Sequence, residues 1–168
     1  MPPEVWLRGP VPGIAPGLMP VVHGLLQARE ELEHSVTDLT TAQLWARPGG
    51  AASIGFHLRH IAGATDRLLT YARGEQLSEA QRAAITGEGE SGAPPDDPGQ
   101  VLHLALEAID RALDVARATS EEDLSASRAV GRAGLPSTVR GLLFHVAEHT
   151  ARHVGQIATT RKIVRASG

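Results

Sequence analysis

The apolar residues of the 168-residue chain recur at intervals of three and four over four long stretches. This spacing lines one face of an α-helix, whereas a half-buried strand would show strict alternation. The stretches begin near Pro20, near Ser53, after Asp97 and after Thr138, and they end near residues 39, 73, 118 and 164. No part of the sequence shows a convincing strand pattern. We therefore predict an all-α protein built as a four-helix bundle.

Residues that favour helix ends stand at several of these boundaries. Pro20 and Pro98 suit the first helical position, where a missing N–H has no consequence. Ser53 and Asp97 can accept hydrogen bonds from the first free backbone amides of a helix. Gly74 suits the position just after the second helix. The end signals therefore agree with the helices that the apolar spacing predicts.

The connecting segments differ from the helices in composition. We predict a Pro/Gly-rich arm at 1–19, short helical pieces at 40–46 and 79–85, a flexible loop at 86–96 and a polar connection at 119–136. Trp6, Leu7 and Ile14 favour packing of the arm onto the rest of the chain. Because no flanking segment is large enough to fold alone, we predict a single domain over residues 1–168.

The composition narrows the classes of function. Lys and Arg total 16 against 19 for Asp and Glu, and no basic stripe stands out, so we do not expect nucleic-acid binding. No apolar run approaches the roughly 20 residues of a membrane span, and the first residues lack the pattern of a signal peptide. We therefore expect a cytoplasmic protein without membrane contact. The chain has no cysteine, which leaves His, Asp and Glu side chains to hold a metal ion.

The histidines are the clearest candidates for chemistry. The chain has eight of them, namely His23, His34, His57, His60, His103, His145, His149 and His153. In the fourth stretch, His145, His149 and His153 stand four residues apart, so neighbours lie about 6 Å apart along one helix face. The outer two lie about 12 Å apart, too far to converge readily on one ion. His153 falls within the apolar stripe and His149 at its edge, which favours this pair. His145 lies further out, as a boundary residue or a donor to a ligand.

A third ligand can come from the second stretch, which contains His57 and His60. On a helical wheel of this stretch, His57 lies nearer the centre of the apolar face and His60 lies on its flank. The wheel alone therefore slightly favours His57 as the third ligand. Three imidazoles are a sufficient protein complement for catalytic zinc and leave positions for water or substrate. A metal ion would also offset the cost of burying imidazoles without partners, which is about a few kcal/mol.

Taken together and in this order, these elements resemble the DinB-like (DinB/YfiT) superfamily of metal-binding four-helix bundles. The resemblance is carried by Ser-Ile-Gly-Phe-His-Leu-Arg-His-Ile-Ala at 53–62, by His-Thr-Ala-Arg-His-Val-Gly-Gln-Ile at 149–157 and by Leu-Trp-Ala-Arg-Pro-Gly-Gly at 44–50. It covers most of the chain. The resemblance implies that His60, His149 and His153 are the metal ligands, because the family's second-helix histidine precedes a Leu/Ile-Ala pair. His57 remains the alternative ligand.

A three-His site suits Zn²⁺ or Ni²⁺ better than Mn²⁺ or Fe²⁺. Two enzyme hypotheses follow for a small-molecule substrate. One is metal-dependent hydrolysis, with a metal-bound water as the nucleophile. The other is a transfer or isomerisation that uses a low-molecular-weight thiol, since the family that the chain resembles includes thiol-dependent transferases. The competing hypothesis is a non-catalytic, stress-related protein that binds a structural metal ion or a small molecule. A homodimer formed through the bundle helices is a further expectation.

Overall fold

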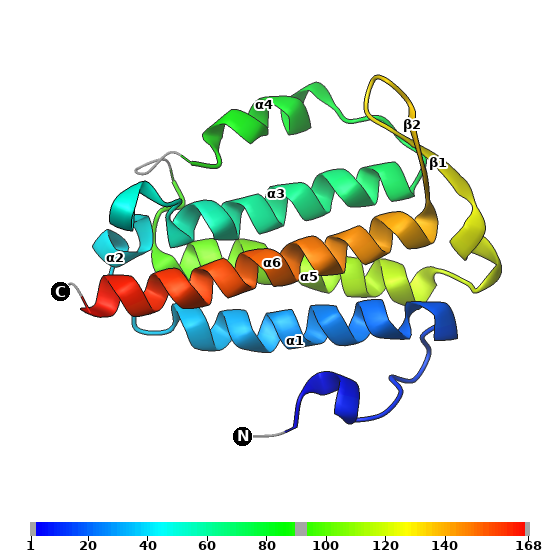
Figure 1. The fold of residues 1–168 in the computed structure, drawn as a ribbon. Helices are drawn as coiled ribbons and strands as arrows, with labels where there is room; N and C mark the ends of the chain where they lie inside the picture. Colours follow the sequence, from blue (N-terminus) through cyan, green and yellow to red (C-terminus); the bar gives the residue numbers. More distant parts are fainter. Residues whose placement is uncertain (1–2, 90–93, 167–168) are drawn as a thin grey trace.

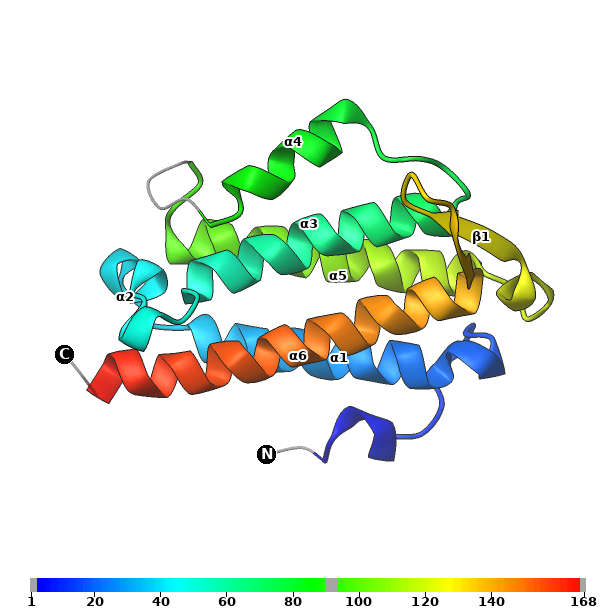
Figure 2. The ribbon, with the colours of Figure 1, turned by 45° about the horizontal axis from the view of Figure 1, so that its top comes forward.

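The computed structural model describes residues 3–89 and 94–166, which form six α-helices and one antiparallel hairpin. Four long helices lie side by side (Figures 1 and 2), namely α1 (Met19–Val36), α3 (Ile54–Ala72), α5 (Pro98–Ala118) and α6 (Val139–Ala166). Two shorter helices, α2 (Thr41–Trp45) and α4 (Glu79–Gly87), lie outside them. The predicted all-α four-helix bundle is therefore confirmed. No helix of the described residues is long and apolar enough to span a membrane.

The predicted helix starts are confirmed by side-chain caps. The Ser53 hydroxyl accepts a hydrogen bond from the Phe56 amide at 3.1 Å, at the start of α3. Asp97 Oδ1 accepts from two amides at the start of α5, and Pro98 follows it as the first helical residue. Thr138 Oγ1 accepts from the Gly141 amide at 3.0 Å, in the first turn of α6. Such caps satisfy backbone donors that a helix leaves unpaired.

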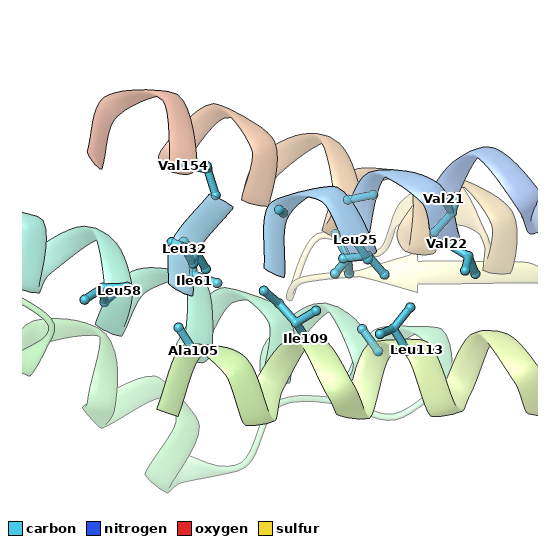
Figure 3. Packing of buried hydrophobic residues seen from close by; sticks show 14 of the residues in the cluster. Val21, Val22, Leu25, Leu32, Leu58, Ile61, Ala105, Ile109, Leu113 and Val154 are labelled. Atoms are coloured by element: carbon cyan, nitrogen blue, oxygen red, sulfur yellow. The ribbon is translucent and has the colours of Figure 1, made fainter. Parts of the chain in front are cut away.

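The four long helices enclose a core of aliphatic side chains. Leu25 and Leu32 of α1 face Leu58 and Ile61 of α3 and Ile109 of α5 (Figure 3), and all five are fully buried. Burying each such side chain contributes about 1.5–3 kcal/mol. Because α3 packs closely against both α5 and α6, the core fixes the position of α3 relative to α6. The histidines of interest lie on these two helices.

The start of α3 is also fixed from outside the core. The helix α2 begins with a capping box between Thr40 and Gln43 and ends before a turn at Pro48–Gly50, as predicted. The Trp45 indole lies over Gly55, where an added Cβ would come within 2.6 Å of the ring. A glycine is therefore needed for this close approach between α2 and α3.

The N-terminal arm contacts the bundle, but through other residues than predicted. It contains two 3-10 turns, Val5–Leu7 and Pro16–Leu18. Val5 and Ile14 are buried, whereas Trp6 and Leu7 are 62% and 58% exposed. The expectation that Trp6 and Leu7 pack inward is wrong, because the 3-10 turn directs Val5 inward in their place.

The predicted polar connection at 119–136 contains a hairpin that the sequence interpretation missed. Strand β1 (Ser127–Val130) pairs antiparallel with β2 (Leu135–Thr138), with Ala129 opposite Pro136. A proline is compatible with a two-stranded sheet, in which both strands are edges. The hairpin leads directly into α6 and closes one end of the bundle (Figure 1).

The prediction of a flexible loop at 86–96 is wrong for the first residues of that range. The helix α4 continues through Gly87, and the next residue, Glu88, is only 6% exposed. Residues 90–93 of the predicted loop lie outside the described part of the chain. In Figures 1 and 2, α4 lies along the outer side of α3, so this segment brings a buried carboxylate to the helix that carries His57 and His60.

Candidate metal centre

Three imidazoles from two facing helices converge at the boundary between the core and solvent. Helix α3 supplies His60, and α6 supplies His149 and His153. The Nε2 atom of His149 lies 3.2 Å from Nε2 of His60 and 3.3 Å from Nε2 of His153. One ring nitrogen from each residue lies within 4.8 Å of the other two, and all three residues are partly buried. The structure thus brings together the three residues that the resemblance implies as ligands.

This spacing matches what a small divalent ion requires. Two nitrogens that are each about 2.0–2.1 Å from Zn²⁺, at a tetrahedral angle, stand about 3.3–3.4 Å apart. The two Nε2 distances in this cluster, 3.2 and 3.3 Å, lie close to that value. Three neutral imidazoles are also a donor set that Zn²⁺ and Ni²⁺ accept. The cluster therefore fits a divalent ion in both spacing and chemistry.

The protonation of His60 follows from its neighbour Glu88. Nδ1 of His60 lies 2.6 Å from Oε2 of Glu88, whose other oxygen accepts from Arg67 Nη1 at 2.7 Å. An ionised carboxylate only accepts hydrogen bonds, so Nδ1 of His60 carries the proton and Nε2 presents a lone pair. Burial acts to raise the pKa of Glu88, but hydrogen bonds from His60 and Arg67 outweigh it and the pKa is lowered. The Glu88 side chain is therefore a carboxylate at neutral pH.

His57 lies beside the cluster but does not join it. Its Nδ1 atom lies 2.9 Å from Nδ1 of His153, on the opposite edge of that ring from the Nε2 that faces His149. His57 is 4% exposed, and burial, followed by repulsion from a protonated His60, lowers its pKa. Since one of the two Nδ1 atoms must donate to the other, His57 holds the orientation of the His153 ring.

The surroundings of His149 and His153 keep both rings neutral at pH 7. Burial is the main cause that lowers the pKa of His149 to about 4 and that of His153 to about 3. Repulsion between protonated rings adds to burial: a positive charge on His60 disfavours protonation of His149, and a positive charge on His149 disfavours protonation of His153. Neutral imidazoles have a lone pair free for a metal ion, so at pH 7 the pair is in the state that coordination requires.

His145 and Gly155 differ from the three clustered residues. The His145 side chain is 47% exposed and contacts Glu148 at 3.2 Å, and it lies outside the cluster, as the helix position predicts. A glycine within a helix, such as Gly155 in α6, is usually tolerated where another backbone packs closely, which is the interpretation that the sequence alone favours. That interpretation is wrong, because an added Cβ at Gly155 would meet no atom within 4 Å.

Two cavities are lined by residues that contact the clustered histidines. One of about 390 Å³ is lined by His57, Arg152, Gly155 and Gln156, among others. A second, of about 270 Å³, lies between α3 and α4 beside Glu88. A larger hollow of about 470 Å³ lies between the arm and α1, but none of the three clustered imidazoles lines it. None of the three clustered imidazoles lines the two smaller cavities either; His57, which contacts His153, lines the first, and Glu88, which contacts His60, lines the second.

The fold and the cluster define a class: a helical bundle in which two facing helices hold three imidazole nitrogens at coordination spacing. The family model of the DinB superfamily matches residues 25–157, and the chain belongs to this superfamily. The match spans α3 and the part of α6 that carries the histidines, and it confirms the resemblance drawn from the sequence. The comparison with curated proteins finds no match.

Proposed function

We propose that the chain binds one divalent metal ion, Zn²⁺ or Ni²⁺, through Nε2 of His60, His149 and His153. We further propose that it is a metal-dependent enzyme acting on a small molecule. The observation that carries the proposal is the pair of Nε2 distances, 3.2 and 3.3 Å, which match the spacing of two ligands of one ion.

The number of protein ligands supports catalysis over a structural role. Structural zinc sites use four protein ligands, whereas catalytic sites use three and keep an open position. Among the described residues, no Asp or Glu oxygen and no fourth histidine joins the cluster. When bound, an ion with an open position supplies Lewis-acid activation of a water, a carbonyl or a thiol.

The chain's own residues would orient the ligands and receive the substrate. The Phe56 ring stacks on the His60 imidazole, with centroids 5.3 Å apart and planes 14° from parallel, and shields one face of that ring from water. The cavity beside His57 is lined by Arg152 and Gln156, among others, and the Arg152 guanidinium also pairs with Glu148 at 2.7 Å. Ala51, Ala52 and Ile163 also line this cavity, so it offers both polar and apolar contacts.

Two reactions suit such a site. One is hydrolysis of a small ester or amide, and the other is a transfer or isomerisation that needs a low-molecular-weight thiol. They differ in their co-substrate, so an activity screen run with and without added thiol separates them. Metal binding without turnover in either screen would identify the non-catalytic, metal-binding alternative.

Metal content is the first test. Elemental analysis by inductively coupled plasma mass spectrometry should find about one divalent ion per chain in the purified protein. Replacing His149 or His153 with Ala should remove it, because each supplies one of three ligands. The matched control is His145→Ala, which should keep the ion because that imidazole lies outside the cluster. A metal-free wild-type protein that takes up no Zn²⁺ or Ni²⁺ on titration would refute the proposal.

A further inference from the structure

Glu88 reaches the centre from a segment that is otherwise held on the surface. No residue of α4 is buried, and its cap is a surface capping box between Ser78 and Gln81. The Gln81 amide donates to Asp66 Oδ2 at 2.7 Å and to Thr70 Oγ1 at 2.8 Å, which ties this end of α4 to α3. Glu88, immediately after α4, is nevertheless 6% exposed. The buried anchor of this segment is thus a carboxylate rather than an apolar side chain.

The space for this carboxylate is provided by a glycine of α3. A Cβ added at Gly63 would fall inside contact distance of Glu88 Oε1 and 2.8 Å from Arg67 Nη1. Glycine in the middle of a helix costs about 1 kcal/mol relative to alanine. Gly63 therefore lowers the intrinsic stability of α3 but leaves room for Glu88 to lie against His60 and Arg67.

A stabilising role alone accounts poorly for this arrangement. A buried ion pair has to overcome the desolvation of both charges, so it is weak evidence for stability compared with an apolar pair of similar size. Its geometry is specific, however: Oε2 of Glu88 accepts from Nδ1 of His60 at 2.6 Å, and Oε1 accepts from Arg67 at 2.7 Å. The carboxylate is held by Arg67 and aimed at the ring edge opposite the Nε2 that faces His149.

We infer that Glu88 is a positioning residue for the metal centre, acting through His60, and that Arg67 and Gly63 hold it in place. The inference rests on the proposed metal site. By accepting a hydrogen bond from Nδ1–H of His60, Glu88 fixes the tautomer in which Nε2 is the ligand atom, holds the ring in the orientation that brings Nε2 to His149, and makes Nε2 a stronger electron-pair donor. Removing such a carboxylate from a histidine ligand typically costs about 10- to 100-fold in metal affinity.

Metal affinity in matched variants provides the first test. Zn²⁺ affinity is measured by competition with a chromophoric chelator for the wild type, Glu88→Gln and Glu88→Ala. Glu88→Gln keeps a hydrogen-bond acceptor but loses the charge, so it should weaken binding by about 10-fold, and Glu88→Ala by about 100-fold. The control is Glu148→Gln, since Glu148 contacts His145 outside the cluster; it should bind as the wild type does.

A second readout separates positioning from a role in holding α4 alone. Nitrogen-15 NMR of the metal-free protein reports which ring nitrogen of His60 carries the proton. We expect the Nδ1–H form in the wild type and in Glu88→Gln, and a mixture of tautomers in Glu88→Ala. Gly63→Ala, which displaces the carboxylate without removing it, should reproduce the loss of affinity even if Glu88→Ala does not fold.

The outcomes are distinguishable. Wild-type Zn²⁺ affinity in Glu88→Gln and in Gly63→Ala would overturn the inference while leaving the metal site intact. An unchanged tautomer in a folded Glu88→Ala protein would overturn it as well. Failure of the wild type itself to bind Zn²⁺ would refute the proposed metal site, and this inference with it.

Discussion

Replacing His60 and His57 in parallel separates a ligand from a neighbour of a ligand. His60→Gln removes an Nε2 atom that lies 3.2 Å from that of His149. His57→Gln removes a ring whose contact is with Nδ1 of His153, at 2.9 Å. Glutamine keeps much of the side-chain volume in both cases, so the comparison isolates the loss of the ring nitrogens.

The expected magnitudes follow from the two positions. Structural zinc sites with four ligands bind with about 10–16 kcal/mol, or roughly 2.5–4 kcal/mol for each ligand. At 1.4 kcal/mol per factor of ten, losing His60 should weaken Zn²⁺ binding on the order of 100- to 1000-fold. His57 acts only by orienting the His153 ring, so its loss should cost about 10- to 100-fold.

Isothermal titration calorimetry measures the Zn²⁺ affinity of both variants, with a competing chelator for the tightest complexes. Circular dichroism should confirm that each variant keeps its helical content. If His57→Gln weakens binding more than His60→Gln does, the assignment of His60 as the α3 ligand is refuted, and helix position alone would have identified the ligand. Equal losses would show that both imidazoles contact the ion.

The remaining predictions concern stability. Gly55→Ala should lower the free energy of unfolding by about 1–3 kcal/mol, because the new Cβ overlaps the Trp45 ring. Gly155→Ala should raise the free energy of unfolding by up to about 1 kcal/mol, since that Cβ meets no neighbour and alanine favours a helix. Urea denaturation measures both glycine variants, and equal effects would contradict the packing described. In the metal-free protein, the pKa values of His149 and His153 are lowered to about 4 and about 3 from 6.5. The unfolded chain therefore binds more protons than the folded one as the pH falls below 6.5, and stability should decrease from pH 7 towards pH 4. If the urea midpoint of the wild type did not change between pH 7 and pH 4, these pKa shifts would be contradicted. A variant with Gln in place of both His149 and His153 should show a much weaker dependence of its urea midpoint on pH.

The four helices could be predicted because their signals are local. Apolar spacing and caps such as Ser53 and Asp97 act within one or two turns, so the sequence around each boundary determines it. The hairpin at 127–138 was missed because each strand has only four residues and the second contains Pro136. Its formation depends on pairing between the strands and on the start of α6, which local patterns do not report.

In the candidate site, too, the local features could be predicted from the sequence and the contacts between helices could not. His149 and His153 could be predicted as a pair because both lie on one helix, one turn apart. Helix position correctly placed His57 nearer the core, where it is 4% exposed, but burial is not the same as convergence. Which α3 imidazole converges with the Nε2 atoms of α6 depends on how the two helices are rotated and offset: His60 Nε2 lies 3.2 Å from His149 Nε2, whereas His57 contacts Nδ1 of His153.

Glu88 could not be predicted for a related reason. It follows a short helix in a glycine-rich segment, and its partners His60 and Arg67 lie 28 and 21 residues earlier in the chain. No local pattern links an acidic residue to partners at that separation. The glycine at position 63 was the available signal, but its meaning depends on knowing that α4 lies along α3.

X-ray diffraction from crystals of the Zn²⁺-loaded protein, recorded above and below the zinc absorption edge, tests the metal site most directly. We expect one anomalous peak per chain, about 2.0–2.1 Å from Nε2 of His60, His149 and His153, with at least one coordination position not taken by the protein. A peak at another site, coordination by His57 in place of His60, or no peak between α3 and α6 would contradict the proposed metal site.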